Sequence, residues 1–232
     1  MLRFIKKMPP GILVLFSVDL ALTLIYLLSR PLHLPDKVST FLDLDAEANL
    51  GSWYSSIQLF LVATMLGVFA FNRFDKEERK SWALLLWPLI FCLLSLDEIA
   101  QIHEWLGLGT DALLPGGTRF NTVLHLTGGW MFFLGIPFLA VMLMLLASLK
   151  QYLFDEAAII KKLFLGLMIF VAASCGVEII GNFVPYGGRA YFLNVSSEEL
   201  GEMLGETLLV WASYELLRSC RFSLRFPKTS QH

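Results

Sequence analysis

Six long apolar runs, separated by short polar segments, follow one another along the chain of 232 residues. Each run is long enough to cross a hydrocarbon core of about 30 Å as an α-helix that rises about 1.5 Å per residue. The pattern predicts an all-α, polytopic membrane protein, in which residues 1–232 form one integral-membrane domain, a bundle of six transmembrane helices. The predicted spans are about 11–29, 52–72, 82–103, 122–149, 162–184 and 197–217.

Lysine and arginine lie mainly at one set of ends of these runs, the set that shares a side with the N-terminus. Of the 18 basic residues, only four flank the opposite ends, namely Arg30, Lys37, Arg119 and Arg189. Cytoplasmic loops of membrane proteins carry the excess of lysine and arginine. The asymmetry therefore predicts that both termini lie in the cytoplasm and that the opposite ends form the outer face.

Composition agrees with a membrane protein. The hydrophobic fraction of 56% and the mean hydropathy of +0.64 lie above the range of soluble domains. The net charge of −2 and the lack of a basic stripe argue against a nucleic-acid partner. The three cysteines fit no CxxC pattern, so we interpret them as small core residues and not as disulfides or metal ligands.

Acidic residues gather toward the predicted outer ends. The third run closes with the string SLDEIAQIHE over residues 95–104. In a continuous helix, Asp97, Gln101 and Glu104 share one face, because residues four and seven apart lie above one another. An amphipathic helix end in the headgroup region is one interpretation, but the string is richer in coordinating groups than solvation requires.

The sixth run contains the string EELGEMLGE, whose Glu199, Glu202 and Glu206 also share one face of a helix. Glu206 falls near the middle of the membrane, where a carboxylate costs about 2.5–3.5 kcal/mol on insertion scales. It therefore needs a proton, a hydrogen bond or a cation. Gly201 and Gly205 form a small-xxx-small pair on a different face, which predicts close approach of a neighbouring helix.

Other polar residues are expected at similar depth. Glu178 and Asn182 are four residues apart near the outer end of the fifth run, and Asn121 and His125 are four apart at the start of the fourth. The outer basic residues Arg119 and Arg189 are candidate counter-ions that fold back over the acids. The loop acids expected to be solvated and to need no function are Asp36, Asp43, Asp45 and Asp111.

Carboxylates and imidazoles on facing helices are how helical bundles hold divalent metals. We therefore predict a site for a divalent metal such as Zn, Fe, Mn or Ca, although the chain lacks the Glu-x-x-His pair of di-iron sites and the His-Glu-x-x-His zinc helix. The candidate ligands are His103, His125, Glu178, Glu202 and Glu206. The candidate general acids or bases are Asp97, Glu98 and Glu104.

The motif SLDE-x4-HE over residues 95–104, the string EExxEMLG over residues 198–205 and the string WYSS over residues 53–56 resemble an uncharacterised group of prokaryotic multipass inner-membrane proteins. The resemblance spans most of the chain and implies a place in the cytoplasmic membrane of a bacterium or archaeon. It implies no activity. The motifs of ceramidase-like hydrolases and of rhomboid proteases are absent from the sequence.

Three functions are compatible with these residues. The first is an intramembrane enzyme that opens to the outer face and acts on a lipid or other apolar substrate. The second is a transporter in which the glutamates from Glu198 to Glu206 lead a cation or proton toward mid-membrane, and on to Asp19. The third is a non-catalytic bundle, an accessory or structural subunit that binds partner membrane subunits.

Overall fold

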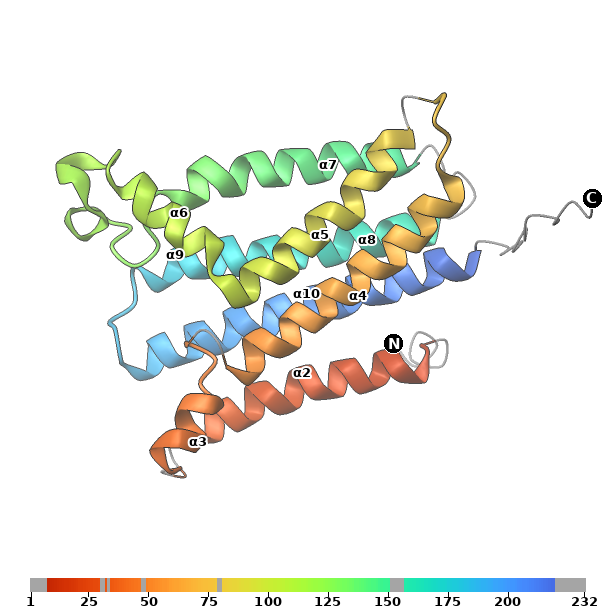
Figure 1. The fold of residues 1–232 in the computed structure, drawn as a ribbon. Helices are drawn as coiled ribbons and strands as arrows, with labels where there is room; N and C mark the ends of the chain where they lie inside the picture. Colours follow the sequence, from red (N-terminus) through yellow and green to blue (C-terminus); the bar gives the residue numbers. More distant parts are fainter. Residues whose placement is uncertain are drawn as a thin grey trace, which may run out of the picture.

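The computed structural model describes residues 8–29, 32, 34–46, 49–78, 81–150 and 157–219, and of residues 149 and 150 only the backbone. Within these ranges the chain is helical and contains no strand. Consecutive long helices lie side by side and run in opposite directions (Figure 1). The long helices are α2 (Pro10–Ser29), α4 (Leu50–Arg73), α5 (Trp82–Ala100), α7 (Ile136–Lys150), α8 (Ala157–Val171) and α10 (Arg189–Ser219).

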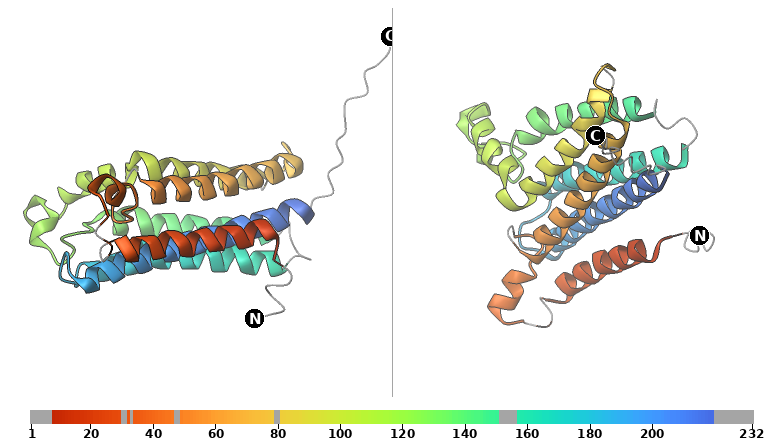
Figure 2. Two further views of the ribbon diagram at one scale, coloured as in Figure 1. Left: turned by 90° about the horizontal axis from the view of Figure 1, so that it is seen from below. Right: turned by 45° about the vertical axis from the view of Figure 1, so that its right-hand side comes forward.

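Shorter elements gather at one end of this bundle, as the views in Figures 1 and 2 agree. Two of them are π-helical turns that extend long helices: one precedes α7 and the other leads from α8 into α9. The short elements are α3 (Asp36–Phe41), α6 (Ile102–Asp111), the 3-10 turns η2 (Pro115–Gly117) and η3 (Arg119–Asn121), the π turns η4 (Met131–Gly135) and η5 (Ala172–Val177), and α9 (Glu178–Gly181).

Five helical segments of the described chain are long and apolar enough to cross a membrane. This confirms the prediction of an all-α chain with several membrane-compatible helices. The sixth predicted span, α10, is not among them, because glutamates interrupt its sequence. The five segments are Pro10–Ser29, Leu50–Arg73, Trp82–Ala100, Met131–Ser148 and Ala157–Gly181.

The polar helix α10 is enclosed by its neighbours α2, α4 and α8. Every residue from Gly205 to Ser213 is buried. A helix that is surrounded on all sides needs no apolar surface toward lipid, and its polar groups are shielded by the other helices. This enclosure explains how a helix with several glutamates occupies the centre of an apolar bundle.

Small residues let α8 and α10 approach until their backbones touch. A Cβ added to Gly205 would lie 2.7 Å from the backbone nitrogen of Phe170, and one added to Gly166 would lie 2.9 Å from the carbonyl oxygen of Gly205. A Cβ on Gly201 would lie 2.7 Å from the Cβ of Ala173. The predicted small-xxx-small packing of Gly201 and Gly205 is confirmed.

Two predicted boundaries are wrong. The third run does not continue to residue 103, because α5 ends at Ala100 and Gln101 adopts a left-handed conformation, with φ of 54°. The fourth run does not begin at residue 122, because residues 122–129 form turns that include Gly128 at φ of 76°. The helical path toward α7 starts only at about Trp130, so Asn121 and His125 lie in the preceding loop.

Candidate functional site

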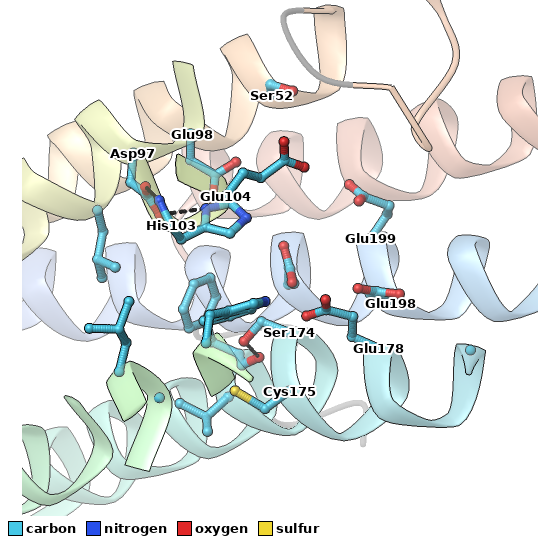
Figure 3. A pocket seen from close by; sticks show the side chains of 18 of the residues that line it. Ser52, Asp97, Glu98, His103, Glu104, Ser174, Cys175, Glu178, Glu198 and Glu199 are labelled. Atoms are coloured by element: carbon cyan, nitrogen blue, oxygen red, sulfur yellow. Dashed lines mark hydrogen bonds and ion pairs between the residues drawn. The ribbon is translucent and has the colours of Figure 1, made fainter. Parts of the chain in front are cut away.

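A cavity of about 710 Å³ lies at the end of the bundle where the short elements gather. Its wall is contributed by α4, α5, α6, η4, α7, α8, η5, α9 and α10, and by the loop before α4. Figure 3 shows side chains from opposite helices pointing into the same space, with Glu98, His103 and Glu104 on one side and Glu178 and Glu198 on the other.

The charge of the cavity wall is strongly one-sided. The described residues that line the cavity include no lysine and no arginine, and the one histidine among them is His103. Such a wall attracts cations, since each carboxylate adds to the same negative potential. The acidic lining residues are Asp45, Asp97, Glu98, Glu104, Glu178, Glu198, Glu199 and Glu202.

The rest of the wall is apolar. Leucine and isoleucine side chains of α5, Leu134 and Phe138 near α7, and Phe170 and Val171 of α8 continue the lining away from the acids. Ligand sites of this kind combine a large apolar surface with a few convergent polar groups. The cavity therefore combines an apolar wall with an acidic wall at one end.

The break at Gln101 brings Asp97 and His103 together. The Asp97 Oδ1 atom accepts a hydrogen bond from the backbone N–H of His103 at 2.7 Å, and the Oδ2 atom lies 2.9 Å from the ring Nδ1. An ionised carboxylate only accepts hydrogen bonds, so a hydrogen bond between Nδ1 and an ionised Asp97 requires the proton on Nδ1. The expected shared face of Asp97, Gln101 and Glu104 does not exist, because α5 ends before Gln101 and α6 begins after it.

The string WYSS ties α4 to three other helices. Tyr54 donates a hydrogen bond to Asp19 of α2 at 2.7 Å, and Ser55 donates one to Glu206 of α10. Ser56 donates to the carbonyl oxygen of Ser95 in α5 at 2.7 Å. Three consecutive side chains thus fix the positions of the helices that carry the cavity acids.

The fifth run contributes one wall residue and one supporting residue. Glu178 lines the cavity, whereas the amide oxygen of Asn182 accepts hydrogen bonds from the backbone N–H groups of Leu126 at 2.8 Å and Thr127 at 3.3 Å. Asn182 also donates to the hydroxyl of Thr127 at 2.7 Å. It holds the loop before α7 against α9, so its role is structural.

Not every predicted site residue lies at the cavity. Asp97, Glu98, His103, Glu104, Glu178 and Glu202 line it, whereas Glu206 and His125 do not. Glu206 lies one helical turn below Glu202 and is fully buried beside Ser55. His125 lies in the turn directly before Leu126 and Thr127, the residues that Asn182 binds, and it is half-buried there.

The loop charges also differ from expectation. Asp111 is buried and paired with Arg119, whose Nε donates to its Oδ2 at 2.6 Å. Asp111 is therefore not a solvated loop charge, and the direct ion-pair partner of Arg119 is Asp111. Asp45 is exposed, as expected, and it also contributes to the cavity wall, where Tyr191 donates a hydrogen bond to it at 2.9 Å.

A second polar cluster, deeper in the bundle, centres on Asp19. Its carboxyl group accepts hydrogen bonds from Tyr54 at 2.7 Å, from Gln58 at 3.3 Å and from Thr207 at 2.9 Å. Asp19, Gln58 and Thr207 are completely buried. The cluster joins α2, α4 and α10 at mid-bundle, and the sequence signal for it was a lone acid inside an apolar run.

The predicted metal site is not supported by the arrangement of the ligands. Among the described residues, no group of three or more histidine, cysteine, aspartate or glutamate side chains is placed to hold a metal ion.

Residues that the sequence did not single out also line the cavity, including Ser52, Trp130, Ser174 and Cys175. The rings of Trp130 and His103 have their centroids 5.1 Å apart and are tilted by 50° to each other.

Fold and cavity together define an all-α protein with membrane-compatible helices and an acid-lined cavity at one end. The chain belongs to the family described as domain of unknown function DUF8692, which matches residues 12–217. The match covers all the long helices almost completely, and with them every acidic residue of the cavity wall. No curated protein and no solved structure shows significant similarity to the chain.

Proposed function

We propose that the chain is a six-span protein of the bacterial or archaeal cytoplasmic membrane, related to the prokaryotic multipass proteins that share its SLDE-x4-HE motif, with both termini in the cytoplasm. The distribution of lysine and arginine supports this orientation. The alternating directions of the helices and the enclosure of α10 support a sixth span that is shielded from lipid. In this arrangement the cavity lies in the outer half of the membrane.

The cavity serves an intramembrane enzyme that binds a lipid or other amphiphilic substrate with its apolar body along α5, α7 and α8. A positive charge meets the carboxylates at the other end. That charge comes either from a cationic group of the substrate or from a divalent metal, for which wall side chains would have to rearrange because no three described residues are placed to hold one. The one-sided charge of the wall is the observation that carries the proposal.

The Asp97–His103 pair supplies the acid–base chemistry. A carboxylate on Nδ1 orients the imidazole and stabilises its protonated form, as in other histidine-based general acid–base sites. The backbone contact from Asp97 to His103 fixes the ring relative to α5. Glu98 and Glu104 lie beside the pair and are the further candidates for proton transfer.

Binding to purified protein in detergent micelles tests the proposal. Four probes are compared: ZnCl₂, MnCl₂, a long-chain alkyltrimethylammonium ion and the neutral alcohol of equal chain length. Saturable binding of a metal or of the ammonium amphiphile, weakened in Glu178→Gln and Glu198→Gln but not in Glu77→Gln, supports it. Glu77 is exposed at the opposite end of the bundle and serves as the matched control.

The two sources of charge give different results. Metal bound without amphiphile, in stoichiometric amount by elemental analysis, identifies the metal-dependent form. Ammonium binding in metal-free protein identifies the cationic substrate. If neither the metal nor the ammonium ion binds, or if no metal binds and the neutral alcohol binds as well as the ammonium ion, the proposed function is wrong.

A transporter is the second candidate, and the position of Glu206 favours it. This carboxyl group is fully buried one turn below the cavity, and its Oε2 atom has no hydrogen-bond partner among the described residues. Buried ionisable residues inside membrane bundles often belong to ion or proton paths. Cation or proton flux into liposomes that is lost in Glu206→Gln would favour this function over the enzyme.

A further inference from the structure

We call the segment from Ile102 to Leu126 the outer cap. It exposes large apolar side chains, although it lies outside the five membrane-compatible segments of the described chain. Five of its apolar residues are between 65 and 79% exposed, namely Trp105, Leu108, Leu113, Phe120 and Val123. Single exposed apolar residues are ordinary on protein surfaces. Five exposed apolar residues within one short segment form a surface that is expected to contact a partner.

Apart from Glu104, which is exposed beside the cavity, the outer cap buries its charged side chains instead of presenting them to water. Between Trp105 and Leu126 the acidic and basic residues are Asp111 and Arg119, with His125 as the other titratable side chain. Asp111 and Arg119 pair with each other, and their side chains are only 12 and 16% exposed. Arg119 also donates to the carbonyl oxygen of Leu126 at 3.2 Å. A loop surrounded by water gains nothing from burying its ion pair and exposing hydrocarbon.

The exposed apolar surface of the cap continues that of the neighbouring helices. On α5, Leu93, Leu96 and Ile99 are each about half exposed and lead to the start of α6. On the far side of the cap, Phe132 and Phe133 of η4 are exposed to a similar degree. These faces belong to segments that are apolar enough to cross a membrane, so they face lipid in the proposed topology. The cap prolongs one lipid-facing surface.

The same cap borders the cavity. Four residues of α6 line it, namely Ile102, His103, Glu104 and Leu106. Leu126, at the other end of the cap, lines it as well. A helix with one apolar face exposed and the other turned to a polar site is typical of elements that lie in the membrane interface. Tryptophan is enriched at this depth, which fits the exposure of Trp105.

We propose that the outer cap lies in the outer leaflet at the boundary between headgroups and acyl chains, and that the cavity beside α6 receives its ligand from the lipid phase. The entry of the ligand from the lipid phase rests on the proposed function. It deepens that function, because it assigns the ligand to the amphiphiles that are dissolved in the membrane. The partner of the cap surface is lipid.

Single-cysteine variants in liposomes test the position of the cap. In a background with Cys92, Cys175 and Cys220 replaced by alanine, cysteines at Leu108 and Phe120 are labelled with an environment-sensitive fluorophore. Thr40→Cys on α3 is the control, because it is an exposed polar position at the same end of the bundle. Quenching by lipids with brominated acyl chains is compared with quenching by iodide in the aqueous phase.

We expect lipid quenching at positions 108 and 120 to exceed that at position 40 several-fold, with iodide quenching in the reverse order. Iodide quenching equal to that at Thr40→Cys would overturn the proposal. Labels reached by neither quencher would indicate a protein partner and would overturn it as well. Where the labelled variants do not fold, tryptophan emission is measured in the otherwise unaltered chain. The part of the lipid-quenched emission that is lost on Trp105→Phe then decides whether the cap contacts lipid.

The two proposals fail separately. Ligand binding in micelles together with a water-exposed cap overturns the position of the cap and leaves the proposed function intact. A lipid-quenched cap in a protein that binds neither metal nor amphiphile leaves the cap in the membrane and removes the function on which the access route depends.

Discussion

Ser56 of α4 and Ser95 of α5 exchange hydrogen bonds, each hydroxyl donating to the backbone carbonyl oxygen of the other residue, at 2.7 and 2.9 Å. Both serines are buried. The pair fixes α5 against α4 less than one turn before Asp97, so the position of the Asp97–His103 pair depends on it. Two motifs that are far apart in the sequence thus meet in one contact.

Replacing Ser56 or Ser95 by alanine is expected to destabilise the bundle by about 1 kcal/mol each, since a hydrogen bond is lost and a carbonyl oxygen loses one partner. The double variant should cost less than the sum, because both substitutions remove the same contact. Reversible unfolding in mixed micelles measures the free energies. Ser17→Ala, whose hydroxyl bonds only within its own helix, is the control.

Asp97→Asn is expected to change the tautomer of His103 with little change in the fold. Because an amide can offer a donor or an acceptor, it no longer requires the proton on Nδ1. Side-chain nitrogen NMR reports the tautomer, and His103→Gln identifies the signal among the four histidines. A spectrum of Asp97→Asn identical to that of the unaltered protein would contradict the assigned pair.

The left-handed conformation of Gln101 gives a matched pair of substitutions. Gln101→Gly should leave the stability unchanged or raise it, because glycine adopts φ of 54° without strain. Gln101→Val should be less stable than Gln101→Gly by about 1–2 kcal/mol, because valine keeps the Cβ that clashes with the carbonyl oxygen in this conformation. Equal stability of the two variants would show that α5 and α6 form one continuous helix.

Gly205→Ala is expected to destabilise the protein by about 1–3 kcal/mol, the range for overpacking a tight interface. The new methyl group would meet the rigid backbone of α8 at 2.7 Å, and backbone cannot rotate away as a side chain can. Gly109→Ala is the control, because nothing lies within 4 Å of the added Cβ. Thermal unfolding of both variants in the same detergent makes the comparison.

Asp19→Ala is expected to cost about 1–3 kcal/mol, because it leaves the buried amide donor of Gln58 without its acceptor, while Tyr54 and Thr207 each lose one of two acceptors. Tyr54→Phe should cost less, since Asp19 keeps two donors. The order of the two unfolding free energies is the measurement. A smaller loss for Asp19→Ala would show that the cluster does not hold α2 against α4 and α10.

The sequence predicted the helices well where lipid and length decide them. Apolar runs of about 20 residues leave few other structures, so α2 and α4 lie within two residues of expectation, whereas α8 begins five residues and α10 eight residues earlier than predicted. The end of α5 was missed because glutamine at positive φ carries no sequence signal. The start of α7 was missed although Gly128 and Gly129 were visible, since the contacts of Asn182 with the loop are remote in sequence.

The candidate site was predicted in location more than in detail. Acids on α5 and α10 meet at one cavity, because antiparallel helices bring their similarly placed ends together. Glu206 and His125 were assigned to the same site on depth alone, and depth does not tell which side of a helix faces the cavity. The pairing of Asp111 with Arg119 depends on a loop conformation that no periodicity describes.

The enclosure of α10 has a consequence for how the protein is made. If α10 is the sixth span, its glutamates make it a poor candidate for independent insertion into lipid. It follows α2, α4 and α8 in the sequence, so these helices are synthesised before it. Membrane insertion of this helix and completion of the fold are then one event, and a chain that ends before residue 189 would leave the acid cavity without its central wall.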